Sequence, residues 1–185
     1  MKASRLIFTL LFASSVAVVQ LAAQQTKADQ RPLKEVRAKA EAGDAQSEVE
    51  LGVRYDDGEG VAKDPAEAVK WFRKAAEQNY ATAQFDLGCC YLEGKGVPKN
   101  QVEAVKWYRK AAEQNDAEGQ LYLGLSYVKG EGVAEDLVEA YKWLLLAARQ
   151  GDESGKKIVT NPLESSLRPE QIAEGQKRAR EFKPR

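Results

Sequence analysis

Histidine is absent from the 185 residues, and cysteine occurs only twice. Without histidine, the chain has no Ser-His-Asp or Cys-His nucleophile pair, no histidine proton shuttle and no zinc site with a histidine ligand. The two cysteines, Cys89 and Cys90, are adjacent, which places their Cα atoms about 3.8 Å apart. Disulfides usually join Cα atoms about 4.4–6.8 Å apart. The sequence therefore predicts neither a histidine-dependent enzyme nor a disulfide framework.

Neither sign of charge predominates, because 28 Lys and Arg residues face 28 Asp and Glu residues. This balance gives no support for nucleic-acid binding or for electrostatic attachment to a membrane. Three short glycine-rich stretches, "GEG", "GKG" and "GEG", lack the strand–loop–helix setting and the terminal Lys-Ser or Lys-Thr of a phosphate-binding loop. We interpret them as helix ends. The sequence thus predicts no catalytic residue, no metal site and no cofactor.

The first 23 residues have the pattern of a secretory signal peptide. Lys2 and Arg5 precede an apolar run, Leu6 to Val19, and Ala23 provides a small residue for cleavage. The run is shorter than the about 20 residues of a membrane span. We expect residues 1–23 to direct export, to the periplasm or the medium, and 24–31 to form a disordered leader. The alternative is an uncleaved anchor, which would make the protein a membrane-tethered envelope regulator.

The remaining chain repeats itself every 36 residues. "KWFRKAAEQN" at 70–79 and "KWYRKAAEQN" at 106–115 differ in one letter. Columns of identical residues recur three times: Leu51, Leu87 and Leu123; Gly52, Gly88 and Gly124; Tyr55, Tyr91 and Tyr127; Trp71, Trp107 and Trp143. This periodicity predicts repeats at 45–80, 81–116 and 117–152. A half-repeat or capping helix is expected at 32–44, and a partial fourth repeat with a C-terminal capping helix at 153–185.

Each repeat is predicted to be an antiparallel pair of helices. "AQSEVELGVRY" has helical spacing, and the glycines of "DGEGV" end that helix. In "DPAE", Asp64 and Glu67 form the pattern of a capping box around Pro65, at the first position of the second helix. One pair cannot bury its own apolar stripe, so the repeats are expected to stack and bury it against the neighbouring repeat.

These residues resemble the Sel-1-like repeat family, a relative of tetratricopeptide repeats. The shared pattern is A-x-x-x-L-G-x-x-Y-x-x-G-x-G-V-x-x-[DN]-x-x-x-A-x-x-W-x-x-x-A-A, which spans residues 45–152. The resemblance implies an all-α, right-handed superhelix with a concave inner face and a non-enzymatic adaptor function. Cysteine-rich members with regularly spaced cysteine pairs have been linked to β-lactam binding or hydrolysis. This chain lacks those pairs, which makes that alternative the weaker one.

The resemblance also implies a binding surface for a protein or peptide. The concave face would carry the outward positions of each first helix, and its more apolar C-terminal part suits an extended peptide or an amphipathic helix. Alternatively, the curvature of the superhelix buries these side chains against neighbouring first helices. The candidate protein-binding residues are Gln46, Val49, Val53, Thr82, Phe85, Cys89, Leu92, Glu118, Leu121, Leu125 and Val128.

The third repeat has Leu144–Leu146 where the first has Phe72–Lys74. Leu145 and Leu146 replace charged residues, and we expect a tail helix at about 169–182 to cover this pair with Ile172, Ala179 and Phe182. The alternative is a homodimer through Leu145 and Leu146. A second route to a dimer is a cross-link through Cys90, which is expected to be exposed because Arg54 and Ser126 occupy its column. Cys89 replaces Val53 and Leu125 and is expected to be a small buried side chain.

Overall fold

The computed structural model describes residues 31–159 and 163–185. The chain divides into two units, with the boundary between Glu35 and Val36, and the second unit, Val36–Arg185, is compact. The expected signal peptide and all but the last residue of the expected leader lie outside the described residues. Across the described ranges every regular element is a helix, so the prediction of an all-α fold is confirmed. The first described helix, α2, runs from Leu33 to Glu41 and spans the boundary between the two units.

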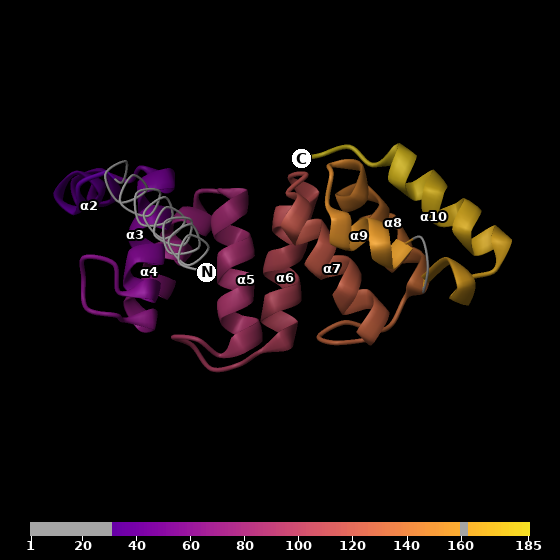
Figure 1. Cartoon of the computed structure of the whole chain (residues 1–185), viewed down its shortest axis with the longest axis horizontal. Coiled ribbons are helices and arrows are strands. Elements are labelled where there is room, and N and C mark those ends of the chain that lie inside the picture. The colour runs from indigo at the N-terminus through magenta and orange to yellow at the C-terminus, as the bar shows by residue number, and fades with distance from the viewer. Residues whose placement is uncertain (1–30, 160–162) are drawn as a thin grey trace, which may run out of the picture. The chain divides into compact units, whose positions relative to one another are not determined.

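Six helices of 13 residues each form three hairpins within the second unit. In each hairpin the first helix packs against the second, and each second helix packs against the first helix of the next hairpin. Figure 1 shows these helices following one another in chain order. The pairs are α3 (Ala45–Asp57) with α4 (Pro65–Glu77), α5 (Ala81–Glu93) with α6 (Gln101–Glu113), and α7 (Ala117–Lys129) with α8 (Leu137–Arg149).

The helix ends follow from the residues at the repeat boundaries. Each first helix ends at a glycine in the left-handed conformation, Gly58, Gly94 or Gly130, with φ of 80°, 77° and 66°. Each second helix begins after a side-chain cap from Asp64, Asn100 or Asp136. The reciprocal half of the predicted capping box is wrong. The Glu67 carboxylate instead accepts a bond from Lys70 at 2.6 Å, because the lysine lies one turn ahead on the same helix.

The interior of each hairpin depends on a glycine opposite a large side chain. Leu51, Leu87 and Leu123 are fully buried. A Cβ at Gly52 would lie 2.5 Å from the Phe72 ring, and one at Gly88 would lie 2.5 Å from the Tyr108 ring. The glycine column therefore recurs because the first helix can have no side chain at the point where a large side chain of the second helix packs against it.

Two series of side-chain hydrogen bonds also repeat along the array. Between consecutive repeats, an arginine of the second helix donates to a tyrosine hydroxyl of the next first helix: Arg37 to Tyr55 at 3.2 Å, Arg73 to Tyr91 at 2.9 Å, and Arg109 to Tyr127 at 2.9 Å. Within a repeat, Gln114 donates to Gln84 at 2.7 Å and Gln150 to Gln120 at 2.9 Å. The arginine series ends where Leu145 takes the arginine position.

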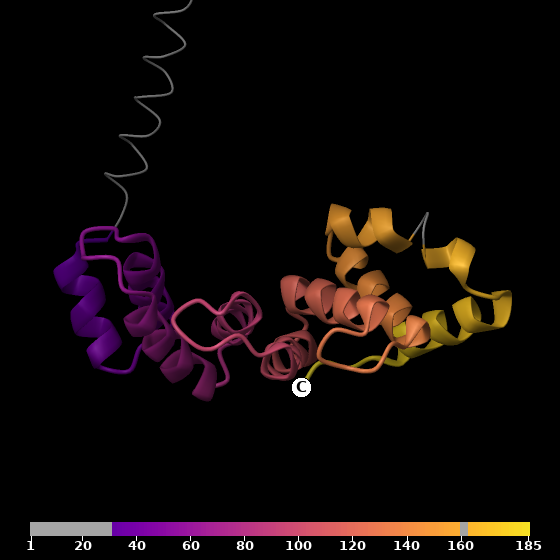
Figure 2. The same ribbon diagram turned by 90° about the horizontal axis from the view of Figure 1, so that it is seen from below.

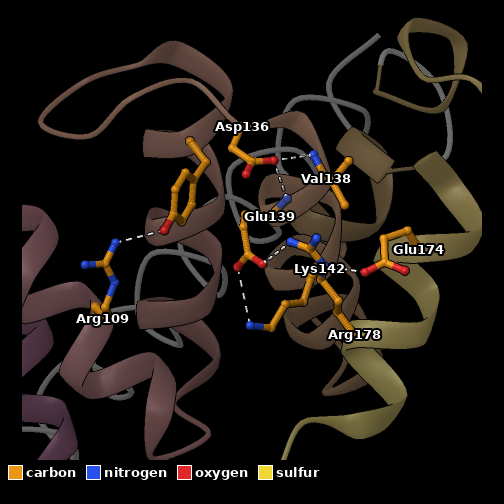
Figure 3. A network of polar contacts seen from close by, with 8 residues as sticks. Arg109, Asp136, Val138, Glu139, Lys142, Glu174 and Arg178 are labelled. Carbon is orange, nitrogen blue, oxygen red and sulfur yellow. Dashed lines mark hydrogen bonds and ion pairs between the residues drawn. The ribbon is translucent and has the colours of Figure 1, made fainter.

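The C-terminal helix α10 (Pro169–Glu181) covers the outer side of α8. It follows two short elements, α9 (Glu153–Ile158) and the 3-10 turn η2 (Glu164–Ser166). Figure 2 shows α10 alongside α8 from a second direction. Figure 3 shows the polar contacts at this interface: Arg178 pairs with Glu139 of α8 at 2.7 Å and with Glu174 of α10 at 2.8 Å.

The expectation that the tail covers the leucines of the third repeat is confirmed for Leu146. This side chain is 8% exposed and lies in one apolar cluster with Ala179 and Trp143. The ring centroids of Trp143 and Phe182 are 5.3 Å apart. Leu145 is half-buried. A dimer through Leu146 would require α10 to move away, and we do not propose one.

Candidate functional site

The eleven predicted positions lie on α3, α5 and α7, and we call the surface they form the first-helix face. The structure divides them into three groups by exposure. Gln46, Val53, Thr82 and Glu118 are exposed, with Val53 at 39%. Leu121 is buried, at 8% exposure. The rest are half-buried: Val49, Phe85, Cys89, Leu92, Leu125 and Val128.

Phe85 lies at the centre of the contact between the second and third repeats. Its ring centroid is 5.2 Å from that of Tyr122 on α7 and 5.8 Å from that of Tyr108 on α6, and the two tyrosines are 5.3 Å apart. The alternative prediction, in which neighbouring helices bury these side chains, therefore holds for part of the Phe85 side chain and for all of Leu121. The open part of the first-helix face is made by the exposed column Gln46, Thr82 and Glu118, by the exposed Val53, and by the edges of the half-buried apolar side chains.

The two cysteines are free, and their exposure is the reverse of the expected one. Cys90 is buried at 6% exposure, because its side chain lies in the cluster formed by α4 and α5, whereas Cys89 is half-buried and accepts a bond from the Tyr108 hydroxyl at 3.6 Å. Burial raises the pKa of Cys89 to about 11 and that of Cys90 to about 12. Both thiols therefore stay protonated near neutral pH and are poor nucleophiles. The prediction of an exposed Cys90 is wrong.

Asp86 is the titratable residue on this face that the sequence analysis missed. It is half-buried, and burial, followed by the negative charges of Glu118, Asp116 and Asp56, raises its pKa to about 7. A sequence signal exists: Glu50 has Arg54 four residues later, whereas Asp86 has Cys90 there. A carboxylate that loses its helical partner and keeps a semi-buried position is expected to be hard to ionise.

Replacing Asp86 by Asn should stabilise the protein above pH 7. The folded protein holds this proton more tightly than the unfolded chain, whose Asp pKa is about 3.9. The contribution of Asp86 to stability therefore falls as pH rises from about 4 to about 7. With solvent screening taken into account, we expect the free energy of unfolding of Asp86→Asn to exceed that of the unmodified protein by about 2 kcal/mol at pH 8 and to match it at pH 4.

Urea denaturation at both pH values measures this difference. Glu93→Gln, which neutralises an exposed carboxylate on the same helix, is the matched control and should change stability by no more than about 0.5 kcal/mol at either pH. A loss of stability in Asp86→Asn at pH 8 would show that the ionised carboxylate is satisfied in the folded protein.

A separate open pocket of about 340 Å³ lies on the second-helix side, between α4 and Val97. Its three cations already have partners within the protein. Lys70 pairs with Glu67 at 2.6 Å, Arg73 donates to Tyr91 at 2.9 Å, and the Lys74 ammonium lies 3.8 Å from the centre of the Trp71 ring. We assign no ligand to this pocket. Its lining residues are Ala66, Val69, Lys70, Arg73, Lys74, Glu77, Gly96 and Val97.

Residues 31–159 and 163–185 contain neither a membrane-spanning helix nor a metal-binding cluster. None of the helices there combines the length and the apolar character needed to cross a bilayer. In the same ranges, no three histidine, cysteine, aspartate or glutamate side chains converge as a metal site would require.

Comparison with known proteins places this architecture in a family. The model of the Sel1 repeat matches residues 45–80, 81–116 and 117–152. A search of the curated proteins gives no match. Among solved structures, a Sel1 repeat protein from Oxalobacter formigenes is 37% identical, with a TM-score of 0.68 over 77% of this chain and 59% of that one.

Two other solved structures are similar. A protective antigen of uropathogenic Escherichia coli that displays an SLR fold is 30% identical, with a TM-score of 0.62, over 83% of this chain and 41% of that one. Cysteine-rich protein B of Helicobacter pylori is 28% identical, with a TM-score of 0.57, over 68% of this chain and 92% of that one. The chain thus spans 59% and 41% of the length of the first two of these proteins.

Proposed function

Because the chain belongs to the Sel1 repeat family, we propose that it is an exported, non-enzymatic adaptor that binds another protein or a peptide through the first-helix face. Proteins built from Sel1 repeats are generally scaffolds that bind other proteins. The proposal extends this general property to a particular surface and a cellular location. Export rests on the sequence of residues 1–23.

The observation that carries the binding proposal is the set of half-buried apolar side chains on α5 and α7. Phe85, Leu92 and Leu125 are partly open, although each also packs on the core beneath. Apolar edges of this kind, beside exposed polar residues such as Thr82 and Glu118, suit a peptide that contributes its own apolar side chains. The outer side of the second helices differs, because α10 occupies it on α8.

Photo-crosslinking tests which surface meets the partner. Benzoylphenylalanine is placed singly at Gln46, Thr82 or Glu118, which are exposed on the first-helix face, and the protein is irradiated in its native cell. Matched control variants carry the probe at Lys70 or Lys106, which are exposed on second helices. We expect each of the first three positions to give a discrete crosslinked product, and the mass added by the crosslinked partner should be the same in all three. The two controls should give no such product. These five positions are exposed, so the probe leaves the core intact.

Crosslinks of equal yield from Lys70 and Lys106, or from these positions alone, would place the contact on the second helices and contradict the proposal. The buried Leu121 and the packed Phe85 are unsuitable as test positions. A charge introduced at either would disturb the contact between repeats as well as any partner.

A further inference from the structure

Asp86 lacks the intramolecular cation that its counterpart in the first repeat has. Glu50 occupies the same position in α3 and accepts a bond from Arg54 at 2.8 Å. In α5 the corresponding partner position holds Cys90, which is uncharged and buried. Within the described part of the chain, no hydrogen bond or ion pair reaches the Asp86 carboxylate. Glu50 therefore has a cation partner among the described residues, whereas Asp86 has none there.

The charges that surround Asp86 are of its own sign. Asp56 of α3, together with Asp116 and Glu118 at the start of α7, acts on it from the two neighbouring first helices. Lys95 is the cation that pairs with Asp56, and it is thereby engaged. A cation from outside would meet several carboxylates at this point, whereas an anionic partner would be repelled.

The first-helix face also carries partly open apolar side chains. Phe85 precedes Asp86 on α5 and Leu92 lies further along the helix, and both are half-buried, while Val53 on α3 is 39% exposed. The first-helix face thus carries both a carboxylate that lacks a cation, near other carboxylates, and partly open apolar side chains. A partner that matches both features would carry a positive charge and apolar side chains.

We propose that the first-helix face binds a peptide segment in which a lysine or arginine is flanked by apolar residues, with the cation paired to Asp86 and the apolar side chains lying on Val53, Phe85 and Leu92. The inference rests on the proposed function and narrows the partner's chemistry. Asp86 has already lost much of its hydration in the free protein. Pairing therefore adds little further desolvation cost for this carboxylate, and most of the remaining cost is that of desolvating the partner's cation. The partner's cation would thus pair with Asp86 as Arg54 pairs with Glu50.

The test uses fluorescein-labelled 12-residue peptides and fluorescence anisotropy on the full chain. One set carries a single Lys or Arg among Leu, Phe and Val positions with polar ends, and matched sets carry Gln or Glu in its place. We expect saturable binding in the cationic set and at least tenfold weaker binding of the Gln and Glu versions. Asp86→Asn, which is expected to fold at least as well as the unmodified protein, should weaken binding of the cationic peptides about tenfold.

Two variants make the assignment specific. Glu93→Gln removes an exposed carboxylate from the same helix and should change the affinity less than twofold. Asp86→Lys should reverse the preference, so that the Glu peptides bind better than the cationic ones. The inference is overturned if no cationic peptide binds, if the Gln versions bind equally, or if Asp86→Asn has no effect. Position-specific crosslinks from Thr82 would still support the proposed function in each of these cases, so the two failures are distinguishable.

Discussion

Gly96→Ala is expected to lower the free energy of unfolding by about 3–5 kcal/mol. Gly96 has a φ of 71°, and a Cβ built there would lie 2.1 Å from the Pro65 carbonyl oxygen. The loop that ends the first helix of one repeat therefore rests on the backbone that begins the second helix of the preceding repeat. An added methyl group must push these two backbones apart. Urea denaturation followed by helical circular dichroism measures the change.

Gly43→Ala separates the two causes of this loss. Gly43 also has a left-handed φ, of 89°, but no described atom lies within 4 Å of a Cβ built there. This control should lose only the conformational part, about 1–2 kcal/mol. Gly132 repeats the arrangement of Gly96 one period later, where a Cβ would lie 2.2 Å from the Gln101 carbonyl oxygen. Equal losses in Gly43→Ala and Gly96→Ala would mean that the repeats do not touch at this point.

Ending the chain at Arg168 is expected to cost about 5 kcal/mol and to expose apolar surface. The truncation removes α10 and with it Ile172, Ala179 and Phe182, which pack on the third repeat. Loss of two or three large apolar contacts of about 1.5–3 kcal/mol each gives this magnitude. Trp143 and Leu146 would then be open, so binding of an apolar-surface dye should rise and the melting temperature should fall.

A shorter truncation supplies the control for the loss of α10. Ending the chain at Phe182 keeps α10 and its aromatic contact and removes the ion pair between Arg185 and Glu113, whose charged atoms are 3.5 Å apart. Because Arg185 is exposed, this pair should contribute less than about 1 kcal/mol. Unchanged melting and dye binding in the chain that ends at Arg168 would contradict the assignment of α10 as the cover of α8.

Much of the fold could be predicted because the repeat period is written directly in the sequence. The columns of Leu51, Gly52 and Trp71 recur, and helix ends follow from Gly58 and from Asp64 with Pro65. Side-chain exposure on the first-helix face could not be predicted in the same way. The three repeats carry different residues there, so each side chain meets a different neighbour. Leu121 is buried for this reason, whereas Val53, two repeats earlier and one turn along, is open.

The cysteines and Asp86 show the same limit at the candidate site. The residues in its column, Arg54 and Ser126, predict Cys90 at the surface, yet this column is covered in the structure. Arg54 is itself buried at 7% exposure and pairs with Glu50, and the Cys90 thiol lies in the cluster of α4 and α5. The sequence does not single out Asp86, because carboxylates on helices are ordinarily hydrated. Its raised pKa arises first from burial and then from the charges of Glu118, Asp116 and Asp56, which lie on or beside the two neighbouring first helices and are distant in sequence.

Hydrogen–deuterium exchange on the protein with and without the partner that co-purifies from its native cell tests the central claim most directly. The claim is that α3, α5 and α7 present the binding surface. Slower exchange in peptides from residues 45–57, 81–93 and 117–129, strongest around Asp86, is the predicted result. Protection confined to α4, α6 or α10, with the first helices unchanged, would contradict it.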